Sequence, residues 1–351
     1  MGSTYHRRFH PPHRLFPARP SLIAAVLVGA LWWACPARAD DLLVTGAGFG
    51  HGVGMSQEGA LGYALHGASY QAIIAHYYTG TAIARVAPGL RVRVLIGGAV
   101  RQIPLETYVR GVVSAEVPAS WPLAALEAQA VVSRTYALTA HAGGSRFDVY
   151  ADTRSQVYRG VAAQTPQTDA AVAATAGQVV TYAGRLAITY FFAGSGGRTE
   201  SVENGFPGSA PAPWLRGVVD PYDRGPLHTW RATMGFATAG ARLRKLVLGR
   251  FRGVEVLRRG FSPRIVAAYV VGTAGRTLVS GPQLAARLGL PDSWAYFSTR
   301  TAAGTVPQPD RSGWTPSRSP EAPPPTAPAS SGGAASAPSA LGGGGGAAGP
   351  A

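Results

Sequence analysis

The N-terminal segment most constrains this chain, because it determines where the folded part begins and which covalent links it can form. Basic residues (His6, Arg7, Arg8, Arg14 and Arg19) precede an apolar stretch from Leu22 to Ala34. Ala37-Arg38-Ala39 then forms an A-x-A sequence directly before Asp40, which predicts a signal peptide over residues 1–39 and an exported mature chain. Because the apolar stretch is shorter than the roughly 20 residues that span a bilayer, we expect no transmembrane helix after cleavage.

The only cysteine, Cys35, lies inside this segment. Lipidation of Cys35 is an alternative fate, although Trp32-Trp33-Ala34 is a poor lipobox and Pro36 follows the residue that would be acylated. After cleavage at Ala39 the mature chain has no cysteine, which excludes disulfides, thiol nucleophiles and thiolate metal sites.

Composition divides the rest of the chain into two parts. From residue 305 the sequence is rich in Pro, Ala, Ser and Gly, which predicts a disordered tail over residues 305–351 because such a segment buries too little apolar surface to offset its ordering entropy. Residues 40–304 are then the folded body.

Hydrophobic periodicity within this body indicates both strands and helices. We expect strands over residues 90–96, 179–182, 186–192 and 265–271, with a second short strand after Gly97-Gly98. Helices are predicted over residues 103–113 and 123–140, the second with Ser120 as N-cap and Pro122 in its first turn. Because these elements do not alternate regularly, we predict a mixed α+β fold, a single catalytic body with a substrate cleft.

The charge balance predicts an affinity for polyanions. Lys and Arg total 32 against 17 Asp and Glu, a formal net charge of +15. The basic residues are spread along the chain, and no helix-turn-helix, zinc-finger or RNA-binding motif is present. We therefore expect anionic wall polymers or lipid headgroups as partners, and no nucleic acid.

Glu116 is the first candidate for chemistry. It lies at the end of an apolar helix and before the turn Pro118-Ala119-Ser120-Trp121-Pro122. A carboxyl group near apolar and aromatic walls loses hydration, which raises its pKa and suits a general acid. The alternative is a solvent-exposed glutamate at a helix end.

The following helix carries Gln129, Ser133, Arg134 and Tyr136. Their amide, guanidinium and phenol groups suit a sugar with N-acetyl and lactyl substituents, whereas Arg134 would alternatively form an ion pair with a carboxylate. Residues 148–160 and 190–200 mix aromatic and small polar residues, as carbohydrate grooves often do.

A glycine-dense segment, residues 46–57, contains His51, Ser56 and Gln57. It has neither a G-x-G-x-x-G register nor a G-K-[ST] sequence, so it is not a phosphate loop. His51, His66 and His76 lack the i, i+4 spacing of a helical zinc site. We predict no metal and no cofactor.

Together these stretches resemble the SpoIID/LytB family. The resemblance extends from about residue 46 to 223 and rests on many short blocks: Glu106–Val113, Ala115–Pro118, Ser120–Pro122, Ala128–Ala130, Ser133–Ala137, Ser155–Tyr158, Ser195–Gly197, Gly50–Gln57, Gly59-Ala60 and His76–Thr81.

The resemblance implies a lytic transglycosylase that cleaves MurNAc–GlcNAc bonds of peptide-stripped glycan strands and leaves 1,6-anhydroMurNAc ends. It implies Glu116 as the catalytic residue. The substrate-binding positions would be Gln129, Arg134, Tyr136, Gln156, Tyr158, His51, Ser56, Gln57 and Ser195. Because Arg134 near Glu116 would oppose an acid role, we expect Arg134 to face substrate or another carboxylate.

Two departures from the family pattern matter. The Gly-His-Gly-Val-Gly block precedes Glu116 here, whereas it follows the glutamate in better-known members. Some members carry cysteine in the block that matches Ser155-Gln156, so Ser155 removes a thiolate ligand and no zinc is expected. Relatives that modify other wall hydrolases, or only bind glycan, provide the alternative function.

Overall fold

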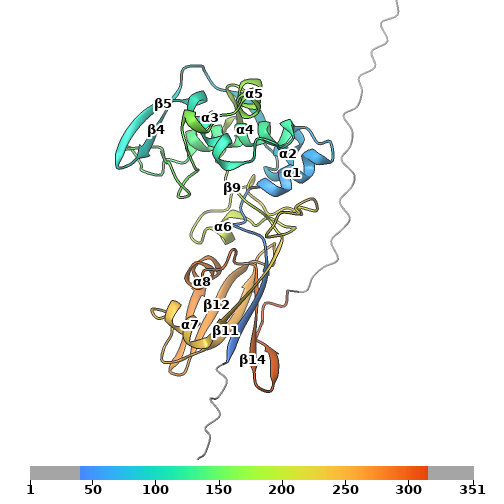
Figure 1. Ribbon diagram of the computed structural model, residues 1–351, viewed down its shortest axis with the longest axis vertical. Helices are drawn as coiled ribbons and strands as arrows, with labels where there is room; N and C mark the ends of the chain where they lie inside the picture. Colours follow the sequence, from blue (N-terminus) through green and yellow to red (C-terminus); the bar gives the residue numbers. More distant parts are fainter. Residues whose placement is uncertain (1–39, 315–351) are drawn as a thin grey trace, which may run out of the picture. The chain divides into compact units, whose positions relative to one another are not determined.

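A computed structural model describes residues 40–314; the predicted signal peptide and residues 315–351 lie outside this part of the chain. The expectation of a mixed α+β fold is confirmed, since helices and strands are interspersed along the chain (Figure 1). No helix within residues 40–314 is long and apolar enough to cross a membrane.

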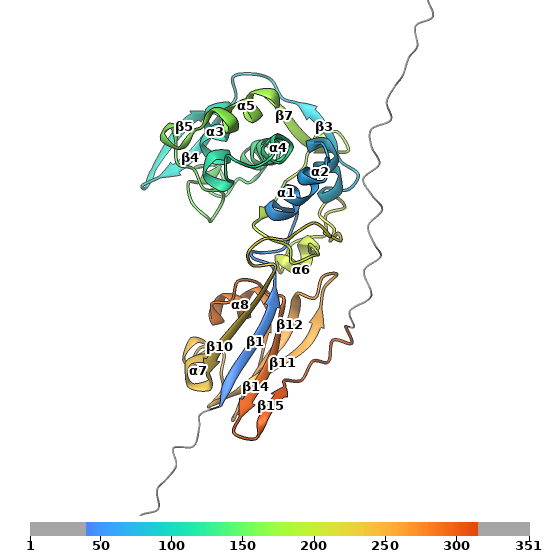
Figure 2. The same cartoon turned by 45° about the vertical axis from the view of Figure 1, so that its right-hand side comes forward.

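The first group of elements surrounds one central helix, α4 (Leu123–Thr139), as Figure 2 shows. The neighbouring elements are α1 (Gln57–Leu65), α2 (Tyr70–Tyr77), α3 (Leu105–Glu116), α5 (Pro166–Ala174) and β7 (Gln178–Tyr182). Small and β-branched residues of α4, such as Ala128, Ala130 and Val131, are fully buried. Alanine at these positions lets the neighbouring helices approach closely, so α4 contributes to two hydrophobic clusters.

Short strands complete this group. The antiparallel hairpin of β4 (Arg91–Ile96) and β5 (Ala99–Pro104) turns at Gly97-Gly98, both at positive φ, and β6 (Val149–Tyr150) adds a parallel strand. Strand β7 pairs with β3 (Ala82–Arg85) and β8 (Arg185–Leu186), and β2 (Met55–Ser56) pairs with β9 (Phe191–Phe192). Two short helices, η1 (Val161–Ala163) and α6 (Val202–Gly205), lie in the connecting segments.

The second group of elements has its own hydrophobic core. One antiparallel sheet has the order β10 (Thr229–Gly235), β1 (Asp41–Ala47), β14 (Ala295–Thr301), β15 (Gly304–Pro307). The other consists of β11 (Phe251–Arg259), β12 (Ile265–Gly272) and β13 (Gly275–Ser280). Helices α7 (Phe236–Arg242) and α8 (Gly281–Leu288) pack on these strands.

The structure corrects three local expectations. Residues 186–192 do not form one strand: β8 ends at Leu186 and β9 begins at Phe191. The Tyr190 carbonyl between them accepts a hydrogen bond from the Met55 N–H, as part of the parallel β2–β9 pairing, and another from the Tyr78 hydroxyl. Helix α4 has Pro122 as its N-cap residue, and Ser120 lies in the preceding turn.

The third correction concerns the start of the tail. Residues 305–314 belong to the folded part, because β15 pairs with β14 from Ser298↔Pro307 to Thr301↔Gly304. Asp310 then forms an ion pair of 2.8 Å with the buried Arg259. The composition of residues 305–314 concealed this, since β15 is exposed and carries few apolar residues.

Candidate functional site

Glu116 ends helix α3 and lies in a pocket of about 540 Å³. The preceding residues of α3 face the core through Tyr108, Val109, Val112 and Val113, so the apolar face of the helix fixes where its last side chain points. The Glu116 Oε1 atom accepts a hydrogen bond of 2.5 Å from the Val157 N–H, and Oε2 accepts one of 3.4 Å from the Gln57 side chain.

The environment of Glu116 favours its protonated form. Burial raises the pKa of Glu116 above its ordinary value, and the hydrogen bonds from Val157 and Gln57 offset only part of this rise. The pocket walls are aromatic and come from Tyr136, Tyr190, Phe191, Phe192 and Phe206. Trp121, which the sequence placed beside Glu116, is not among the lining residues.

Gln57 links Glu116 to helix α4. Its amide nitrogen lies 3.4 Å from both Glu116 Oε2 and Gln129 Oε1. Gln129 in turn donates to the Ser133 hydroxyl at 2.9 Å, and Gln156 donates to the Ser133 carbonyl and the Tyr108 hydroxyl. A line of buried polar groups therefore fixes the Gln57 side chain against the carboxylate.

His51 lies in the same pocket among aromatic rings. Its ring centroid is 4.8 Å from that of Phe206 and 5.4 Å from that of Phe192. Its Nδ1 atom accepts a hydrogen bond from the Val53 N–H. Burial lowers the pKa of His51 to about 4, so the imidazole is neutral near pH 7.

Glycines place His51 there. Gly48, Gly50, Gly52 and Gly54 all have positive φ. A Cβ atom on Gly52 would lie 2.4 Å from the Arg264 Nε atom, and one on Gly54 would lie 2.0 Å from the Tyr190 carbonyl oxygen. The segment thus needs glycine both for its backbone conformation and for its close approach to neighbouring groups.

Four of the predicted site residues line the pocket: Glu116, Tyr136, His51 and Gln57. Although the His51–Gln57 block precedes Glu116 in the chain, the structure brings them together. Gln129 reaches the pocket only through Gln57, and Gln156 is buried behind it. Tyr158 stacks on Tyr108, with ring centroids 5.1 Å apart.

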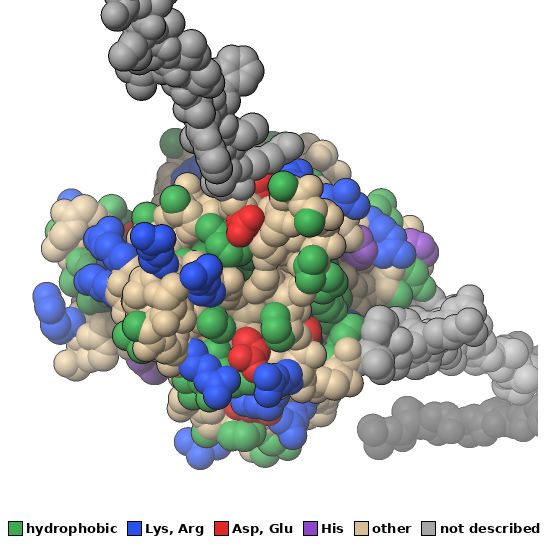
Figure 3. Space-filling view, turned by 90° about the horizontal axis from the view of Figure 1, so that it is seen from below, with side chains coloured by type: hydrophobic (Ala, Val, Ile, Leu, Met, Phe, Trp, Pro, Cys, Tyr) green, Lys and Arg blue, Asp and Glu red, His purple; other side chains and the backbone are tan. Residues whose placement is uncertain are grey.

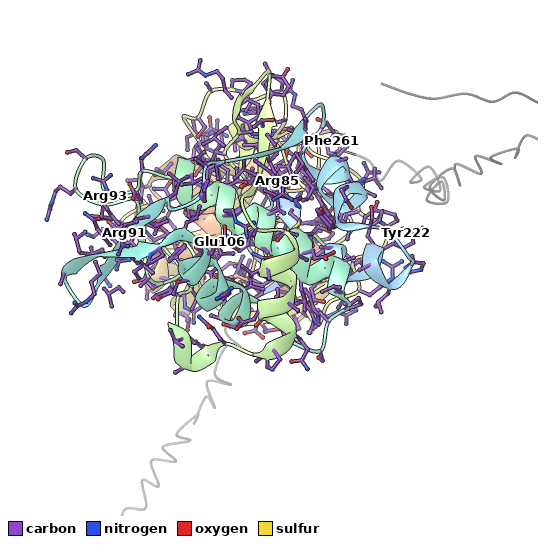
Figure 4. The ribbon with its side chains drawn as sticks, turned by 90° about the horizontal axis from the view of Figure 1, so that it is seen from above. Arg85, Arg91, Arg93, Glu106, Tyr222 and Phe261 are labelled. Carbon is purple, nitrogen blue, oxygen red and sulfur yellow. The ribbon has the colours of Figure 1, made fainter. Side chains whose placement is uncertain are left out.

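Arg134 is not in the pocket. Its side chain is fully buried and binds Glu106 through two hydrogen bonds of 2.9 and 2.7 Å. It also donates to the carbonyls of Gln178, Ala130 and Val172. Glu106, labelled in Figure 4, lies on α3. Of the two expectations for Arg134, the structure shows the second, a pairing with another carboxylate.

Ser56 and Ser195 are also fully buried away from the pocket. Ser56 is the N-cap of α1, where its hydroxyl accepts from the Gly59 N–H at 3.0 Å. The Ser195 hydroxyl donates to Asp223 Oδ2 at 2.8 Å. Both serines therefore fix the backbone beside Gln57 and Ala193 instead of presenting hydroxyls to a ligand.

Sequence reasoning missed Arg154, Phe49 and Phe206 as lining residues. Arg154 pairs with Asp152 at 2.7 Å and lies over the Tyr150 ring, 3.9 Å from its centroid. Only the occurrence of Arg154, Phe49 and Phe206 in or near mixed aromatic and polar runs could have indicated that they line the pocket.

Within residues 40–314 no three His, Cys, Asp or Glu side chains gather in a way that would hold a metal ion.

These features define an α+β domain that presents one helix-end carboxylate in an aromatic pocket. Residues 97–182 match the model of the SpoIID family, described as Stage II sporulation protein. The resemblance stated from the sequence is thereby confirmed. The matched segment contains Glu116, Gln129 and Tyr136, whereas His51 and Gln57 lie outside it.

Individual proteins agree with this assignment. Stage II sporulation protein D of Bacillus subtilis is 34% identical over 158 residues, which cover 40% of this chain and 45% of that protein. An uncharacterised protein of Brachyspira hyodysenteriae is 35% identical over 140 residues, 39% of this chain and 38% of its own length. The amidase enhancer of Bacillus subtilis is 38% identical over 103 residues, 29% of this chain and 14% of the relative. The chain thus matches less than half the length of each of these relatives.

Proposed function

We propose that this protein is an exported lytic transglycosylase that cleaves MurNAc–GlcNAc bonds in peptidoglycan glycan strands. The observation that carries the proposal is the single carboxylate of the Glu116 pocket. Among the described residues that line it, Glu116 is the only acidic one. Hydrolysis of a glycosidic bond normally uses two carboxyl groups, one as acid and one as base or nucleophile.

A lytic transglycosylase needs only one such group. Protonated Glu116 donates its proton to the glycosidic oxygen as the C1–O bond breaks and an oxocarbenium-like centre forms. The resulting carboxylate then accepts the proton of the MurNAc C6 hydroxyl, whose oxygen bonds to C1 and closes the 1,6-anhydro ring. No water is consumed, and Glu116 ends the cycle protonated again.

The pocket supports each half of this cycle. Burial within the aromatic walls raises the pKa of Glu116, which favours the protonated form that the first step needs. The Val157 N–H and the Gln57 amide stabilise the carboxylate that forms after proton transfer. Tyr136 and His51 lie beside the carboxylate as groups that would contact the sugar, with His51 neutral.

The cell envelope is the compartment that fits this activity. The N-terminal segment has the pattern of a signal peptide. Lys and Arg side chains outnumber acidic ones on the face seen in Figure 3, in keeping with the formal charge of +15. Such a surface favours retention by anionic wall polymers.

The alternative is a protein that modifies another wall hydrolase without cleaving glycan itself. One observation favours this alternative: part of the chain is 38% identical to an amidase enhancer. A modifier requires the glycan-binding pocket but not the proton of Glu116.

The deciding experiment incubates peptide-stripped glycan strands with the chain from Asp40 onward and analyses the products by mass spectrometry. Anhydro ends made by the parent but not by Glu116→Gln support the proposal. Reducing ends would mean hydrolysis by water. Intact strands with both proteins would instead favour the modifier, which is then tested by adding a purified wall amidase.

A further inference from the structure

A second pocket lies beside the sheet that contains β1, β10 and β14. Its volume is about 780 Å³, larger than that of the Glu116 pocket. Four aromatic side chains line it: Trp230, Trp294, Tyr296 and Trp314. None of them lies in the segment that matches the SpoIID family.

Strand register explains how the pocket forms. Thr45 on β1 is directly opposite Arg231 on β10 and Tyr296 on β14, so these three side chains share one face of the sheet. All three are exposed, whereas Leu42 and Val44 of β1 are buried in the core. Gly46 leaves room for the buried Trp230 ring, since a Cβ atom there would lie 2.2 Å from the Trp230 side chain.

The lining has the chemistry of a saccharide site. Aromatic rings that combine an apolar face with a polar rim can stack on the C–H face of a sugar, while adjacent polar groups bond its hydroxyls. Tyr296 is 37% exposed, and the Arg259 guanidinium lies over one face of its ring, 4.2 Å from the centroid, which leaves the other face for a ligand. Arg231 forms no ion pair within residues 40–314, so its guanidinium is free for a carboxylate or hydroxyl of a ligand.

Two backbone segments connect this aromatic pocket to the Glu116 pocket. Ala47 and Gly196 line the aromatic pocket, and Phe49 and Ala193 line the Glu116 pocket. The segments are joined between these points by hydrogen bonds from the Phe49 N–H to the Gly194 carbonyl (2.7 Å) and from the Gly194 N–H to the Phe49 carbonyl (3.1 Å). Ala47 and Phe49 are two residues apart, at most about 7 Å of extended chain.

We infer that the aromatic pocket binds a second stretch of the same glycan strand that occupies the Glu116 pocket. The choice of this ligand rests on the proposed function, and the short backbone connection between the two pockets supports one polymer over two separate ligands. Binding at both places holds a long strand more tightly than a short one, because the second contact is made within an already bound molecule. The pocket is therefore a distal binding site that favours long strands.

The test uses the Glu116→Gln protein, which retains both pockets while removing turnover. The ligands are end-labelled, peptide-stripped glycan strands of two lengths, long strands and tetrasaccharides. Fluorescence anisotropy measures the affinity of the protein for each length separately. Tyr296→Ala and Trp294→Ala should each weaken binding of long strands by about tenfold, as loss of an aromatic anchor does, and leave tetrasaccharide binding unchanged. Trp294→Phe should retain most of the affinity, and Leu278→Ala, an exposed apolar residue of β13 (62% exposed), is the matched control.

Equal binding of long strands by the Tyr296 and Trp294 variants and their parent would overturn the inference. It would also be overturned if truncation after Trp314 were needed before strands bound, since residues 315–351 would then be the occupant. Failure of this inference can be distinguished from failure of the proposed function. If the parent chain does not cleave glycan, the Glu116→Gln protein should still bind long strands more tightly than tetrasaccharides.

Discussion

The backbone N–H of Val157 donates a 2.5 Å hydrogen bond to the Glu116 carboxylate, which connects the end of α3 to the loop after β6. This bond stabilises the charged carboxylate, yet burial has the larger effect and the pKa of Glu116 stays above its ordinary value. The pKa of Glu116 is therefore higher in the folded than in the unfolded protein. The stability that Glu116 contributes is fully present below the pKa of the unfolded state, and it is lost as pH rises through the pKa of the folded state.

Gln57→Leu tests this balance. The Gln57 amide donates to Glu116 and lowers its pKa, so its removal should raise that pKa further. Activity that requires protonated Glu116 falls as pH rises, and we expect this alkaline limb to move to higher pH by up to about one unit. The pH dependence of anhydro-end formation measures it. Glu127→Gln, a second glutamate whose pKa is raised by burial, is the control and should leave the limb in place. A shift to lower pH would contradict the assignment.

Arg134→Met tests whether Arg134 acts through folding. Its guanidinium is fully buried against Glu106, so the substitution removes the charged partner of that carboxylate, which keeps the Gly177 N–H as a donor, and leaves several carbonyl groups without a donor. Loss of one partner of such a pair should lower the free energy of unfolding by about 3–5 kcal/mol. Urea unfolding measures the loss. Glu106→Gln should also be destabilising, because it leaves the charge of the fully buried Arg134 without its carboxylate partner.

Kinetics separate this role from substrate binding. At a temperature where Arg134→Lys remains folded, KM for glycan strands should equal that of the parent. A raised KM with unchanged unfolding would mean that Arg134 contacts substrate.

Local patterns in the sequence predicted the elements around Glu116 well. The strand near Arg91, the turn at Gly97-Gly98 and the helix that ends at Glu116 all carry their own periodicity or turn residues. The sequence could not predict that β1 would lie between β10 and β14, because that pairing joins residues about 190 and 250 positions apart, such as Val44 with Ala232 and Phe297.

The site was less predictable than the fold. Glu116 was a candidate because a lone carboxyl group follows an apolar helix, and the resemblance to the SpoIID/LytB family implied its catalytic role. Ser56 and Ser195 carry the same polar groups as ligand-binding residues, and only their burial against Asp223 shows that they are structural. Arg134 posed the same difficulty, since a sequence does not show which carboxylate an arginine meets.

Gly52→Ala tests the packing of the glycine segment against Arg264. Gly52 has φ +83°, and its Cβ would meet the buried Arg264 side chain. Gly67 is a matched control, with φ +82° and nothing within 4 Å of its Cβ position. Gly67→Ala should cost about 1–2 kcal/mol for the left-handed conformation alone, and Gly52→Ala should cost more in urea unfolding. Because His51 precedes Gly52, the variant should also lose activity. Equal losses of stability at the two positions would show that the Arg264 side chain moves aside without a cost in free energy.

Two neighbouring buried aspartates should contribute to stability with different pH dependences. Burial raises the pKa of Asp220 to about 7, and the charge of Asp223 adds to this rise. Burial would also raise the pKa of Asp223, but the nearby His228, whose Nδ1 atom lies 3.7 Å away, and hydrogen bonds from Ser195 and the backbone N–H groups of Gly225 and Gly196 outweigh it and hold that pKa at about 2.

Asp220→Asn should therefore stabilise the protein at pH 8. The stability that Asp220 contributes is present below its ordinary pKa of 3.8 and is lost as pH rises through about 7. An asparagine resembles the protonated aspartate and avoids that loss, so the advantage of the variant should shrink as pH falls from 8 to 4. Asp223→Asn should instead destabilise the protein by a nearly constant amount between pH 4 and 8, because a lowered pKa contributes stability above 3.8 that is lost only as pH falls through about 2. Urea unfolding at pH 4, 6 and 8 measures both variants, and an Asp220→Asn protein less stable than the parent at pH 8 would show that the charged carboxylate is well accommodated.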